Sequence, residues 1–527
     1  MAPPISQMKQ QETIAFLNRP ESYGLDELAE VRCVQTHGAF IFLAGEHAYK
    51  LKRDVRLPYL DFSSVEKRRL VCENEVRLNR RTAPTLYHGV VAIERQADGR
   101  LTIGVVGGTS GAGGEGQIVD WLVKMRRFPD DALLSRVVAK GPLSPQTVHD
   151  LADIIAEFHG AAEKSSAWGG ADEVARIAKG NLESIARYTP ELFDPVAARE
   201  LAQATLAAVE AQRELLEWRR GNGFVRHGHG DLHLANIYLD DGRPRLFDAI
   251  EFDDRLAQID VLYDLAFLLM DLWHRDFRGE ANRIFSRYLL RTGDMAGLGA
   301  LPLFLSLRAG IRAHVTATMA TGVEDNQALR AEAVRYLDLA AVMLRPRPAI
   351  LLAVGGFSGS GKTHLAAALA PMLGPAPGAV HLRSDELRKV MLDQEPESPL
   401  EPSAYTSTIS GQVYAQLRQR AGQALDAGQA VIADAVHNHP GSRDALTALA
   451  RHGKVPFIGI WLDADPDLMA QRIAGRHGDA SDADAAVMQR QVASGTGAIN
   501  WHRINAAQPL EVKLQKIQTL LVKHALC

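Results

Sequence analysis

The sequence predicts a multidomain protein in which an α+β part is followed by an α/β part with a parallel sheet. Three observations support this prediction. The chain has 527 residues, more than one hydrophobic core usually organises. Short β-type runs near the N-terminus give way to long amphipathic helical segments after Pro142. Beyond residue 348, apolar strands alternate with helices, which is typical of parallel α/β sheets.

The composition is that of an ordinary globular protein, with 46% hydrophobic and 23% charged residues. The net charge of −4 gives no reason to expect nucleic acid as a partner. Three cysteines, Cys33, Cys72 and Cys527, are too few for a disulfide framework. The most apolar helical stretch, 262–272, contains two aspartates and is too short to span a bilayer. We therefore expect a cytoplasmic protein with no membrane partner, and the sequence leaves its oligomeric state open.

The N-terminal part begins with β-type segments. Residues 31–57 are predicted to form a hairpin with its turn at Gly45-Glu46. Residues 64–81 have the apolar spacing of a helix. Further strand-like runs lead to a glycine-rich loop at 107–116 and to another strand at 118–128. The order of these segments predicts a β-rich region with one early helix.

A linker separates this part from the second one. Helical segments dominate the remainder of the first part, apart from a compact run of motifs at 224–254. The sequence RPRP at 345–348 is the best candidate for a linker, because two prolines forbid helix and favour an extended connection. We predict a first domain at 1–344 and a second at 349–527.

The second domain opens with a phosphate-binding motif. Residues 356–363, GFSGSGKT, match GxxxxGK[ST] in full, after the apolar strand 349–354 and before a helix. Glycines let backbone N–H groups close around phosphates, and the helix N-terminus favours negative charge. Lys362 is expected to reach the β- and γ-phosphates of ATP and Thr363 to hold Mg²⁺. The predicted nucleotide-binding residues here are Gly356, Ser358, Gly359, Ser360, Gly361, Lys362 and Thr363.

Two further strands of the second domain end in aspartates. Asp385 follows a strand at the edge of the sheet where ligands of such folds bind, and is a candidate base for an acceptor hydroxyl. Arg388, one helical turn on, is placed to hold an anionic group, such as the transferring phosphate. The alternative is that Ser384 or Asp385 caps a helix. Asp434 ends the apolar run VIADAV and is a candidate ligand for Mg²⁺ or its water.

A pair of arginines follows towards the C-terminus. Arg472 and Arg476 lie four residues apart, on one face of a predicted helix. They are candidates for a lid that closes over the phosphates and stabilises charge in the transition state. The alternative for this pair is an ordinary solvated helix face.

The first domain carries a cluster of polar residues within 227–251. In HGDLHLAN, Asp231 precedes Asn236 by five residues, and the strand-like RLFD ends at Asp248. Protein kinases use the same order of groups, with one aspartate beside the acceptor hydroxyl and an asparagine and a second aspartate on Mg²⁺. We therefore predict Asp231 as base, with Asn236 and Asp248 as metal ligands.

HGDLHLAN resembles the HGDxHxxN signature of aminoglycoside phosphotransferases and their relatives, which include choline, fructosamine and homoserine kinases. This resemblance implies a protein-kinase-like bilobal domain that binds ATP through a strand lysine and a helix glutamate. Lys50 and Lys52 share a strand face by parity, and Lys50 is favoured narrowly. Of Glu73 and Glu75, Glu73 is favoured slightly. The strand 118–128 is expected to meet adenine.

Three features leave choices open in this first domain. Glu251, Asp253 and Asp254 either line a cleft for a polycationic acceptor or anchor the loop after Asp248. No GxGxxG loop joins the first strands, since only Gly38 lies there, so ATP and GTP both remain possible as phosphate donors. His227 and His233 are expected to support the loop through hydrogen bonds rather than to bind a metal.

The motifs GFSGSGKT, RSDELRK, IADAVHNHPGSRD and RIAGRHGDASDAD resemble those of the P-loop small-molecule kinases, a group that includes gluconate kinases, polynucleotide 5′-kinases, chloramphenicol phosphotransferase and zeta toxins. The combination of both halves resembles bacterial bifunctional aminoglycoside phosphotransferase/ATP-binding proteins with an AAA-type P-loop domain. It implies a P-loop NTPase fold in the second half. Two functions stay open. Either each half transfers a γ-phosphoryl group to a small hydroxylated metabolite, or one half senses nucleotide and regulates the other.

Overall fold

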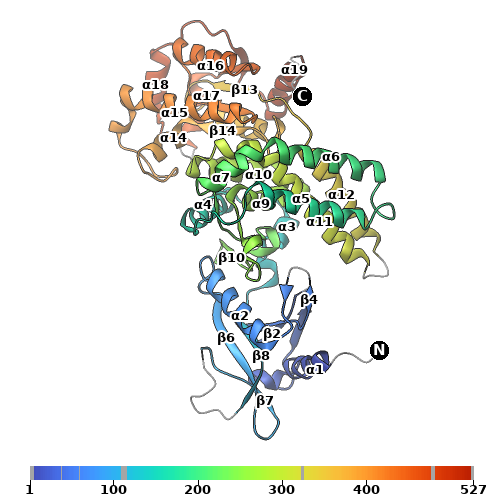
Figure 1. Cartoon of the computed structure of the whole chain (residues 1–527). Coiled ribbons are helices and arrows are strands. Elements are labelled where there is room, and N and C mark those ends of the chain that lie inside the picture. Colours follow the sequence, from blue (N-terminus) through green and yellow to red (C-terminus); the bar gives the residue numbers. More distant parts are fainter. Residues whose placement is uncertain are drawn as a thin grey trace. The chain divides into compact units, whose positions relative to one another are not determined.

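A computed structural model describes residues 5–36, 38–57, 60–107, 116–321, 326–475 and 481–523. The chain forms two compact units that interleave along the sequence (Figure 1). The first comprises Met1–Gly141, Ala161–Trp168 and Val225–Asp264. The second comprises Pro142–Gly160, Gly169–Phe224 and Leu265–Cys527. Each unit is described by itself below.

The first unit is built on a six-stranded antiparallel sheet with the order β1-β2-β3-β8-β6-β7. Its strands are β1 Val31–Gln35, β2 Ala39–Ala44, β3 His47–Lys52, β6 Tyr87–Arg95, β7 Leu101–Ile103 and β8 Gln117–Arg126. The hairpin predicted over 31–57 therefore consists of three strands. Its turn at 45–46 is confirmed, whereas a second turn, in which Ala39 N–H donates to Thr36 Oγ1, divides the first run.

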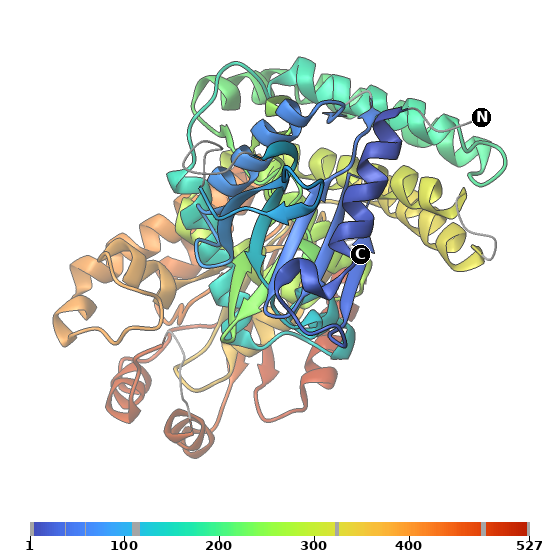
Figure 2. The same cartoon turned by 90° about the horizontal axis from the view of Figure 1, so that it is seen from below.

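Helices cover both faces of this sheet. On one face, α2 (Val65–Asn79) packs Cys72 and Val76 against Val123 and other core residues. On the other, α1 (Ile5–Leu17) contributes Leu17 to a second cluster, and Figure 2 shows α1 alongside the strands. The predicted helix at 64–81 is confirmed. Ser64 caps it, because its side chain accepts a hydrogen bond from the backbone N–H of Lys67.

The remaining elements of the first unit carry or support the motif region. They are η1 Pro20–Tyr23, β4 Arg56–Leu57, β5 Leu60–Asp61, η2 Asp130–Ala132, α3 Leu134–Lys140, β9 Val225–His227, η3 Leu234–Asn236, β10 Ile237–Asp240, β11 Arg243–Leu246, α8 Asp254–Ala257 and β12 Gln258–Asp260. Strands β10 and β11 form a two-stranded ribbon, and β9 pairs with β12. These two ribbons hold the ends of the loops in which the HGDLHLAN motif and Asp248 lie.

The second unit contains a helical part and a parallel sheet. Its helices before the linker are α4 Pro145–Ala161, α5 Ala171–Ala186, α6 Pro195–Ala211, α7 Arg213–Gly221, α10 Arg278–Thr292, η4 Ala296–Ala300, α11 Leu301–Thr321 and α12 Gln327–Met343. The helix α9 (Val261–His274) begins in the first unit and ends in the second. Among the helices that the structure describes, none is long and apolar enough to cross a membrane.

The parallel sheet has the order β14-β15-β13-β16-β17. Its strands are β13 Leu351–Gly355, β14 Val380–Arg383, β15 Val431–Asp434, β16 Phe457–Asp463 and β17 His502–Asn505. The accompanying helices are α13 Lys362–Leu369, η5 Ala370–Met372, α14 Ser384–Met391, η6 Pro402–Tyr405, α15 Ser407–Asp426, α16 Pro440–His452, α17 Pro466–Ala474, α18 Ala485–Ala493 and α19 Leu510–Lys523. The predicted order of an α+β part followed by an α/β part is confirmed.

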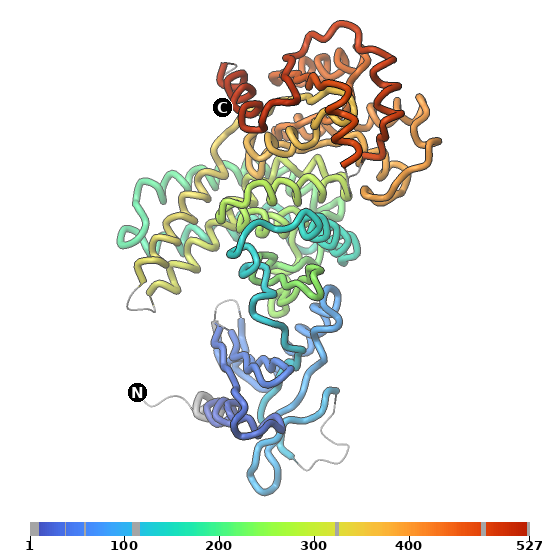
Figure 3. The backbone as a smooth tube through the Cα atoms, turned by 180° about the vertical axis from the view of Figure 1, so that it is seen from behind, coloured from blue at the N-terminus to red at the C-terminus, as the bar shows by residue number. Residues whose placement is uncertain are grey.

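The second unit includes residues from both sides of the predicted linker. Figure 3 shows the backbone passing from α12 into the parallel-sheet half through residues 344–350. Besides this covalent link, α10 packs against β14, η5 and α14. The helical residues 265–344 thus belong to the same compact unit as the P-loop half, although the linker separates them in sequence.

Candidate active sites

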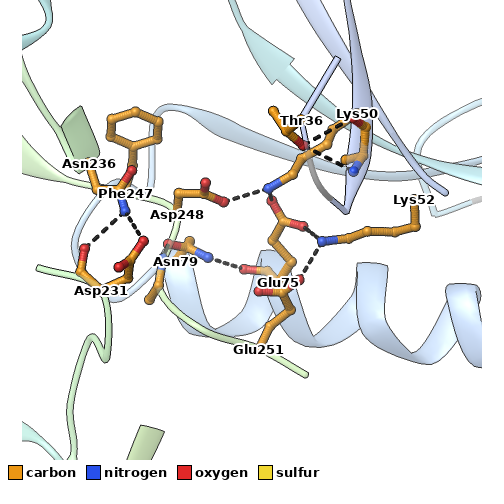
Figure 4. A network of polar contacts seen from close by, with 12 residues as sticks. Thr36, Lys50, Lys52, Glu75, Asn79, Asp231, Asn236, Phe247, Asp248 and Glu251 are labelled. Carbon is orange, nitrogen blue, oxygen red and sulfur yellow. Dashed lines mark hydrogen bonds and ion pairs between the residues drawn. The ribbon is translucent and has the colours of Figure 1, made fainter. Parts of the chain in front are cut away.

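The first candidate site is a network of buried charges on β3, α2 and the loop after β11 (Figure 4). Lys50 Nζ lies 2.9 Å from Glu75 Oε1 and 2.5 Å from Asp248 Oδ1. Lys52 Nζ lies 2.5 Å from Glu75 Oε2 and also pairs with Glu251. Both lysines share one face of β3, as parity predicts, so one glutamate forms ion pairs with both. Of the two candidate glutamates, Glu75 is the one that pairs with the strand lysines, and Lys50 is the lysine that also pairs with Asp248.

Electrostatic balance keeps this network ionised. Burial by itself would raise the pKa of Glu75, but Lys50 and Lys52 outweigh burial and lower it to about 2. Burial would lower the pKa of Lys50, yet the carboxylates of Asp248, Glu75 and Glu251 raise it well above its ordinary value. For Glu251, burial dominates over Lys52 and raises the pKa. Lys50 is thus a fixed positive charge, as expected for a group that binds phosphates.

The preference for Glu73 over Glu75 is corrected by the structure. Glu73 is 46% exposed and pairs with Arg69 one helical turn away. Glu75 is fully buried and faces β3. The reason is helical geometry, because positions 72, 75, 76 and 79 form one buried stripe of α2 and position 73 lies outside it.

We expect Glu75→Gln to lower the free energy of unfolding by about 3–5 kcal/mol, because it leaves two buried lysines without their shared partner. Glu73→Gln removes only an exposed pair and should change stability by less than about 0.5 kcal/mol. Urea denaturation of both variants beside the wild type measures this difference. Equal destabilisation by the two changes would contradict the assignment of Glu75.

The stabilising effect of Glu75 should depend on pH with a definite sign. Its pKa falls from 4.5 to about 2 on folding, so folding favours the ionised form. The contribution of ionised Glu75 to the free energy of unfolding is complete above the unfolded pKa of 4.5. It is lost as the pH falls through the folded pKa of about 2. We expect the stability difference between wild type and Glu75→Gln to be constant from about pH 8 to about pH 5 and to shrink below it. Denaturation at a series of pH values tests this, and a difference that grows on acidification would refute it.

The loop of the HGDLHLAN motif holds Asp231 and Asn236 side by side (Figure 4). Asn236 Nδ2 donates to Asp231 Oδ2 at 2.8 Å and to the Asp231 carbonyl oxygen at 2.9 Å. His233 Nδ1 accepts from the backbone N–H of Ala235, which leaves Nε2 to face Asp231 Oδ2 at 3.3 Å. The side chain of Asp231 is 40% exposed. This carboxylate is therefore oriented by its neighbours and accessible to an acceptor.

Buried contacts fix the backbone of this loop. Asp264 of α9 accepts from the backbone N–H groups of His229 and Gly230. The His229 ring accepts from the N–H of Asp231 through Nδ1 and approaches the carbonyl oxygen of Phe247 through Nε2 at 2.9 Å. Burial lowers the pKa of His229, so the ring is neutral and Nε2 carries its proton. Of the two histidines expected to support this loop, His233 accepts from the N–H of Ala235, whereas the buried Nε2 of His227 has no hydrogen-bond partner among the described residues.

Asp248 lies in a loop that α2 anchors. Its backbone has φ +61°, a left-handed conformation that costs a non-glycine residue energy and is often found at functional sites. The N–H of Asp248 donates to the hydroxyl of Tyr87, and the N–H of Ala249 donates to Asn79 Oδ1. Glu251, further along the loop, is buried against Lys52, and Asp253 caps α8. The positions of Glu251 and Asp253 therefore agree with the alternative in which they anchor the loop after Asp248 rather than line an acceptor cleft.

Asn236 and Asp248 are chemically suited to hold Mg²⁺. Because Asn236 uses its amide nitrogen for Asp231, its Oδ1 is the oxygen available to a metal. Asp248 directs one oxygen to Lys50 and is 38% exposed, so its carboxylate reaches solvent. Mg²⁺ prefers such hard oxygen ligands and keeps several waters. The donor set therefore fits a magnesium ion.

The segment predicted to meet adenine is a central strand. Backbone groups of β8 pair with β3 on one side and β6 on the other. The backbone N–H of Arg127 also donates to the carbonyl oxygen of Glu46. Backbone atoms that contact a base must therefore follow residue 127, where Phe128 stacks on Tyr238 at 4.5 Å between ring centroids. A glycine-rich loop is predicted at 107–116, and its residues 108–115 lie outside the described residues.

The second candidate site surrounds the phosphate-binding loop between β13 and α13. Gly359 has φ +84°, and a Cβ atom there would lie 2.6 Å from the carbonyl oxygen of Met469, so only glycine fits. Gly361, with φ +89°, is the N-cap of α13. Lys362 Nζ donates to the carbonyl oxygen of Phe357. The N–H of Ser358 donates to Gln491 Oε1 of α18 at 2.9 Å.

A cavity of about 360 Å³ adjoins this loop. It is lined by the predicted residues Ser358, Gly359, Gly361, Lys362, Thr363, Asp385, Arg388, Asp434 and Arg472. The predicted Gly356 and Ser360 lie in the same loop, and Ser360 is buried. The structure thus brings together residues from the loop after β13 and from α13, α14, β15 and α17. Cavities of this size hold small ligands.

The acceptor side of the cavity contains Asp385 and Arg388, one turn apart on α14. Asp385 does not cap α14, since the N-cap residue is Arg383 and no side-chain capping bond is formed. The Arg388 guanidinium lies over the ring of Tyr405 at 4.7 Å and donates to the carbonyl oxygen of Ala404. Arg388 therefore supports the 402–405 turn and also faces the cavity.

Asp434 and Arg472 lie on opposite sides of the loop. Burial would raise the pKa of Asp434, but the hydrogen bond from His381 and nearby cations lower it to about 2, so the carboxylate is ionised. Together with the Thr363 hydroxyl, it is a donor set that fits Mg²⁺. Arg472 donates to the carbonyl oxygens of Ser360 and Ala506. Arg476, its predicted companion, lies outside the described residues.

Several residues of these sites escaped prediction. Lys389 is buried and pairs with Asp482, which also accepts from the hydroxyl of Tyr405. His381 donates to Asp434, and Gln491 contacts the phosphate-binding loop. Of these, only Lys389 gave a signal in the sequence, because a lysine on the apolar face of a short helix needs a buried partner. The others depend on contacts between segments far apart in the chain.

Two family models match the chain. The model described as "Phosphotransferase enzyme family" matches residues 105–301, and the model described as "AAA domain" matches residues 351–496. Both predicted resemblances are confirmed. Together with the two sheets, the matches also confirm the predicted fold class, with a kinase-like fold in the N-terminal part and a P-loop fold around the parallel sheet. The chain thus contains two kinase-like domains.

Similar proteins of comparable length occur in mycobacteria. Proteins described as uncharacterized, from Mycobacterium bovis and from two strains of Mycobacterium tuberculosis, are 29% identical over 485 residues. The alignment covers 90% of this chain and 92% of each relative. Both halves are therefore included in the match.

Two solved kinase structures match parts of the chain. A gluconokinase from Sinorhizobium meliloti is 22% identical and has a TM-score of 0.25, with 34% of this chain and 95% of that chain covered. A choline/ethanolamine kinase family protein from Mesorhizobium loti is 11% identical and has a TM-score of 0.39. The match covers 64% of this chain and 95% of that chain.

Proposed function

We propose that the protein is a two-domain ATP-dependent phosphotransferase, in which each domain transfers a γ-phosphoryl group to a hydroxyl group of a small, sugar-like metabolite. One observation carries the proposal for the first domain. An accessible carboxylate, Asp231, lies beside Asn236, while Lys50, Glu75 and Asp248 form a separate ionised cluster. This division into a base and a phosphate-binding group is what phosphoryl transfer requires.

The proposed reaction of the first domain balances as follows. The acceptor O–H group loses its proton to Asp231 as its oxygen forms a bond to the γ-phosphorus, and the bond from that phosphorus to the β-γ bridging oxygen breaks. ADP leaves, and the phosphorylated acceptor is the product. Asn236 and Asp248 would hold Mg²⁺, which would supply positive charge beside the phosphates. Lys50 binds the phosphates, and Glu75 holds Lys50 in position.

The second domain offers the same division of roles. The loop 356–363 and Lys362 would bind the phosphates, with Thr363 and Asp434 as metal ligands. Asp385 is the proposed base, and Arg388 and Arg472 the proposed cations beside the transferring group. The cavity of about 360 Å³ favours an acceptor of metabolite size over a polymer.

A screen of ATP consumption tests this function. Sugars, sugar acids, aminoglycosides and nucleosides would be supplied as acceptors to the wild type and to Asp231→Ala and Lys362→Ala. We expect at least two acceptor-dependent activities, one lost in each variant. If one variant lost no activity while the other lost all of it, one domain would be a nucleotide-sensing regulator. Consumption that no acceptor stimulates would contradict a phosphotransferase.

A further inference from the structure

The edge strand of the P-loop sheet is covered by a helix that precedes the linker. Strand β14 pairs with β15 on one side only, so its other side presents unpaired backbone groups. Asn282 of α10 donates through Nδ2 to the carbonyl oxygens of Pro377 and Ala379, at 3.1 and 2.9 Å. The N–H of His381 donates to Ser286 Oγ of the same helix at 3.1 Å. Side chains of α10 thus take the place of a neighbouring strand.

Ion pairs fix α10 at this position. Arg287 is buried and donates to Asp153 of α4 and to Glu397, at 2.7 Å each. Arg291, one turn further, pairs with Asp153 and with Glu395. Glu395 and Glu397 follow α14, the helix that carries Asp385. The helix is therefore held from two sides, by α4 and by the segment after α14.

The side chain of His381 connects this contact to the phosphate site. Its Nε2 lies 3.1 Å from Asp434 Oδ2, and both side chains are largely buried. An ionised carboxylate can only accept hydrogen bonds, so Nε2 carries the proton and donates it. This bond fixes the plane of the Asp434 carboxylate, which lines the cavity beside Lys362 and Thr363.

We propose that His381 is a positioning residue of the P-loop half, which orients Asp434 towards the phosphate-binding loop, and that α10 holds His381 in place. The inference rests on the proposed function of that half, because it takes Asp434 as a ligand of Mg²⁺. It adds that the P-loop site is completed by a helix from the preceding kinase-like part. Hydrogen-bond partners of metal ligands commonly contribute about 10–100-fold to metal affinity.

Metal binding to the full-length protein tests the inference without relying on turnover. Mn²⁺ would be titrated into the protein in the presence of a non-hydrolysable ATP analogue, and its binding followed by electron paramagnetic resonance. All variants would also carry Asp248→Ala, which weakens metal binding at the first candidate site. His381→Phe keeps a ring but removes the donor, and should weaken Mn²⁺ binding about 10–100-fold. His381→Gln keeps an N–H donor and should restore most of the affinity. His452→Ala, an exposed histidine on α16, serves as control.

Ser286→Ala tests the part played by α10. It removes the acceptor of the His381 N–H and should weaken Mn²⁺ binding in the same direction, by a smaller factor. If His381→Phe bound Mn²⁺ as tightly as the Asp248→Ala background protein, the positioning role of His381 would be overturned. If Ser286→Ala left Mn²⁺ binding unchanged, the role of α10 would be overturned. If the background protein itself bound no Mn²⁺ with the analogue, the proposed function of the P-loop half would be wrong, and the inference with it.

Discussion

Replacing Asp231 with asparagine is expected to lower the turnover number of the first domain about 10²–10⁴-fold, the usual contribution of a general base. Binding of Mg·ATP should survive, because in the proposed mechanism Lys50, Asn236 and Asp248, and not Asp231, bind the phosphates and the metal. The variant keeps the shape of the side chain and an oxygen that accepts from Asn236. Steady-state kinetics with the acceptor found in the screen, beside calorimetric titration of Mg·ATP, measures both quantities.

Asp248→Ala is the matched comparison and should behave differently. It removes a proposed metal ligand and the partner of Lys50, so the affinity for Mg·ATP itself should fall. Asp98→Asn, at an exposed aspartate between β6 and β7, should change neither quantity. A loss in kcat of less than about tenfold in Asp231→Asn would mean that this residue only shapes the loop. Equal loss of nucleotide affinity in Asp231→Asn and Asp248→Ala would also contradict the assignment.

The second large effect is expected from Lys362→Ala in the P-loop half. Removing a cation from the transferring phosphate should reduce ATP turnover by this half about 10²–10³-fold or more. Measured in the Asp231→Asn background, the remaining turnover belongs to the P-loop half, so the loss is observed directly. The reason is the position of Lys362 at the first residue of α13, beside the cavity that Thr363 and Asp434 also line.

Lys516→Ala, on the exposed face of α19, provides the control for a lost surface lysine. With Asp231 intact, Lys362→Ala should leave the activity of the first domain unchanged. If Lys362→Ala silenced both activities while its thermal unfolding stayed that of the wild type, the two domains would be coupled in function. Retention of full turnover by the P-loop half in Lys362→Ala would rule out its proposed role.

Local motifs predicted the loops of both sites well. The loop 356–363 and the pair Asp231 and Asn236 depend on residues close together in the chain, and their spacing is enough to suggest their geometry. The error at Glu73 had a different source. The stripe of α2 that carries Cys72, Val76 and Asn79 includes position 75, so counting helical turns identifies the buried glutamate.

Contacts between distant segments could not be predicted in this way. His381 reaches Asp434 because β14 pairs with β15, and the strand order of the sheet is not written in either segment. The pairing of Lys52 with Glu251 joins residues 199 positions apart. Similarly, the pairing of β8 with β3 and β6, which uses its backbone groups on both sides, depends on segments far from it in the chain.

The cover that α10 provides for β14 has a consequence for the newly synthesised chain. A ribosome makes α10 about ninety residues before β14, and N-terminal segments generally fold first. Strand β14, whose outer edge has unpaired backbone groups, therefore emerges from the ribosome after α10 has been made. A gene fragment that encoded the P-loop half alone would expose this edge, and unprotected edges promote aggregation. The order of the two domains in the gene thus contributes to the solubility of the second.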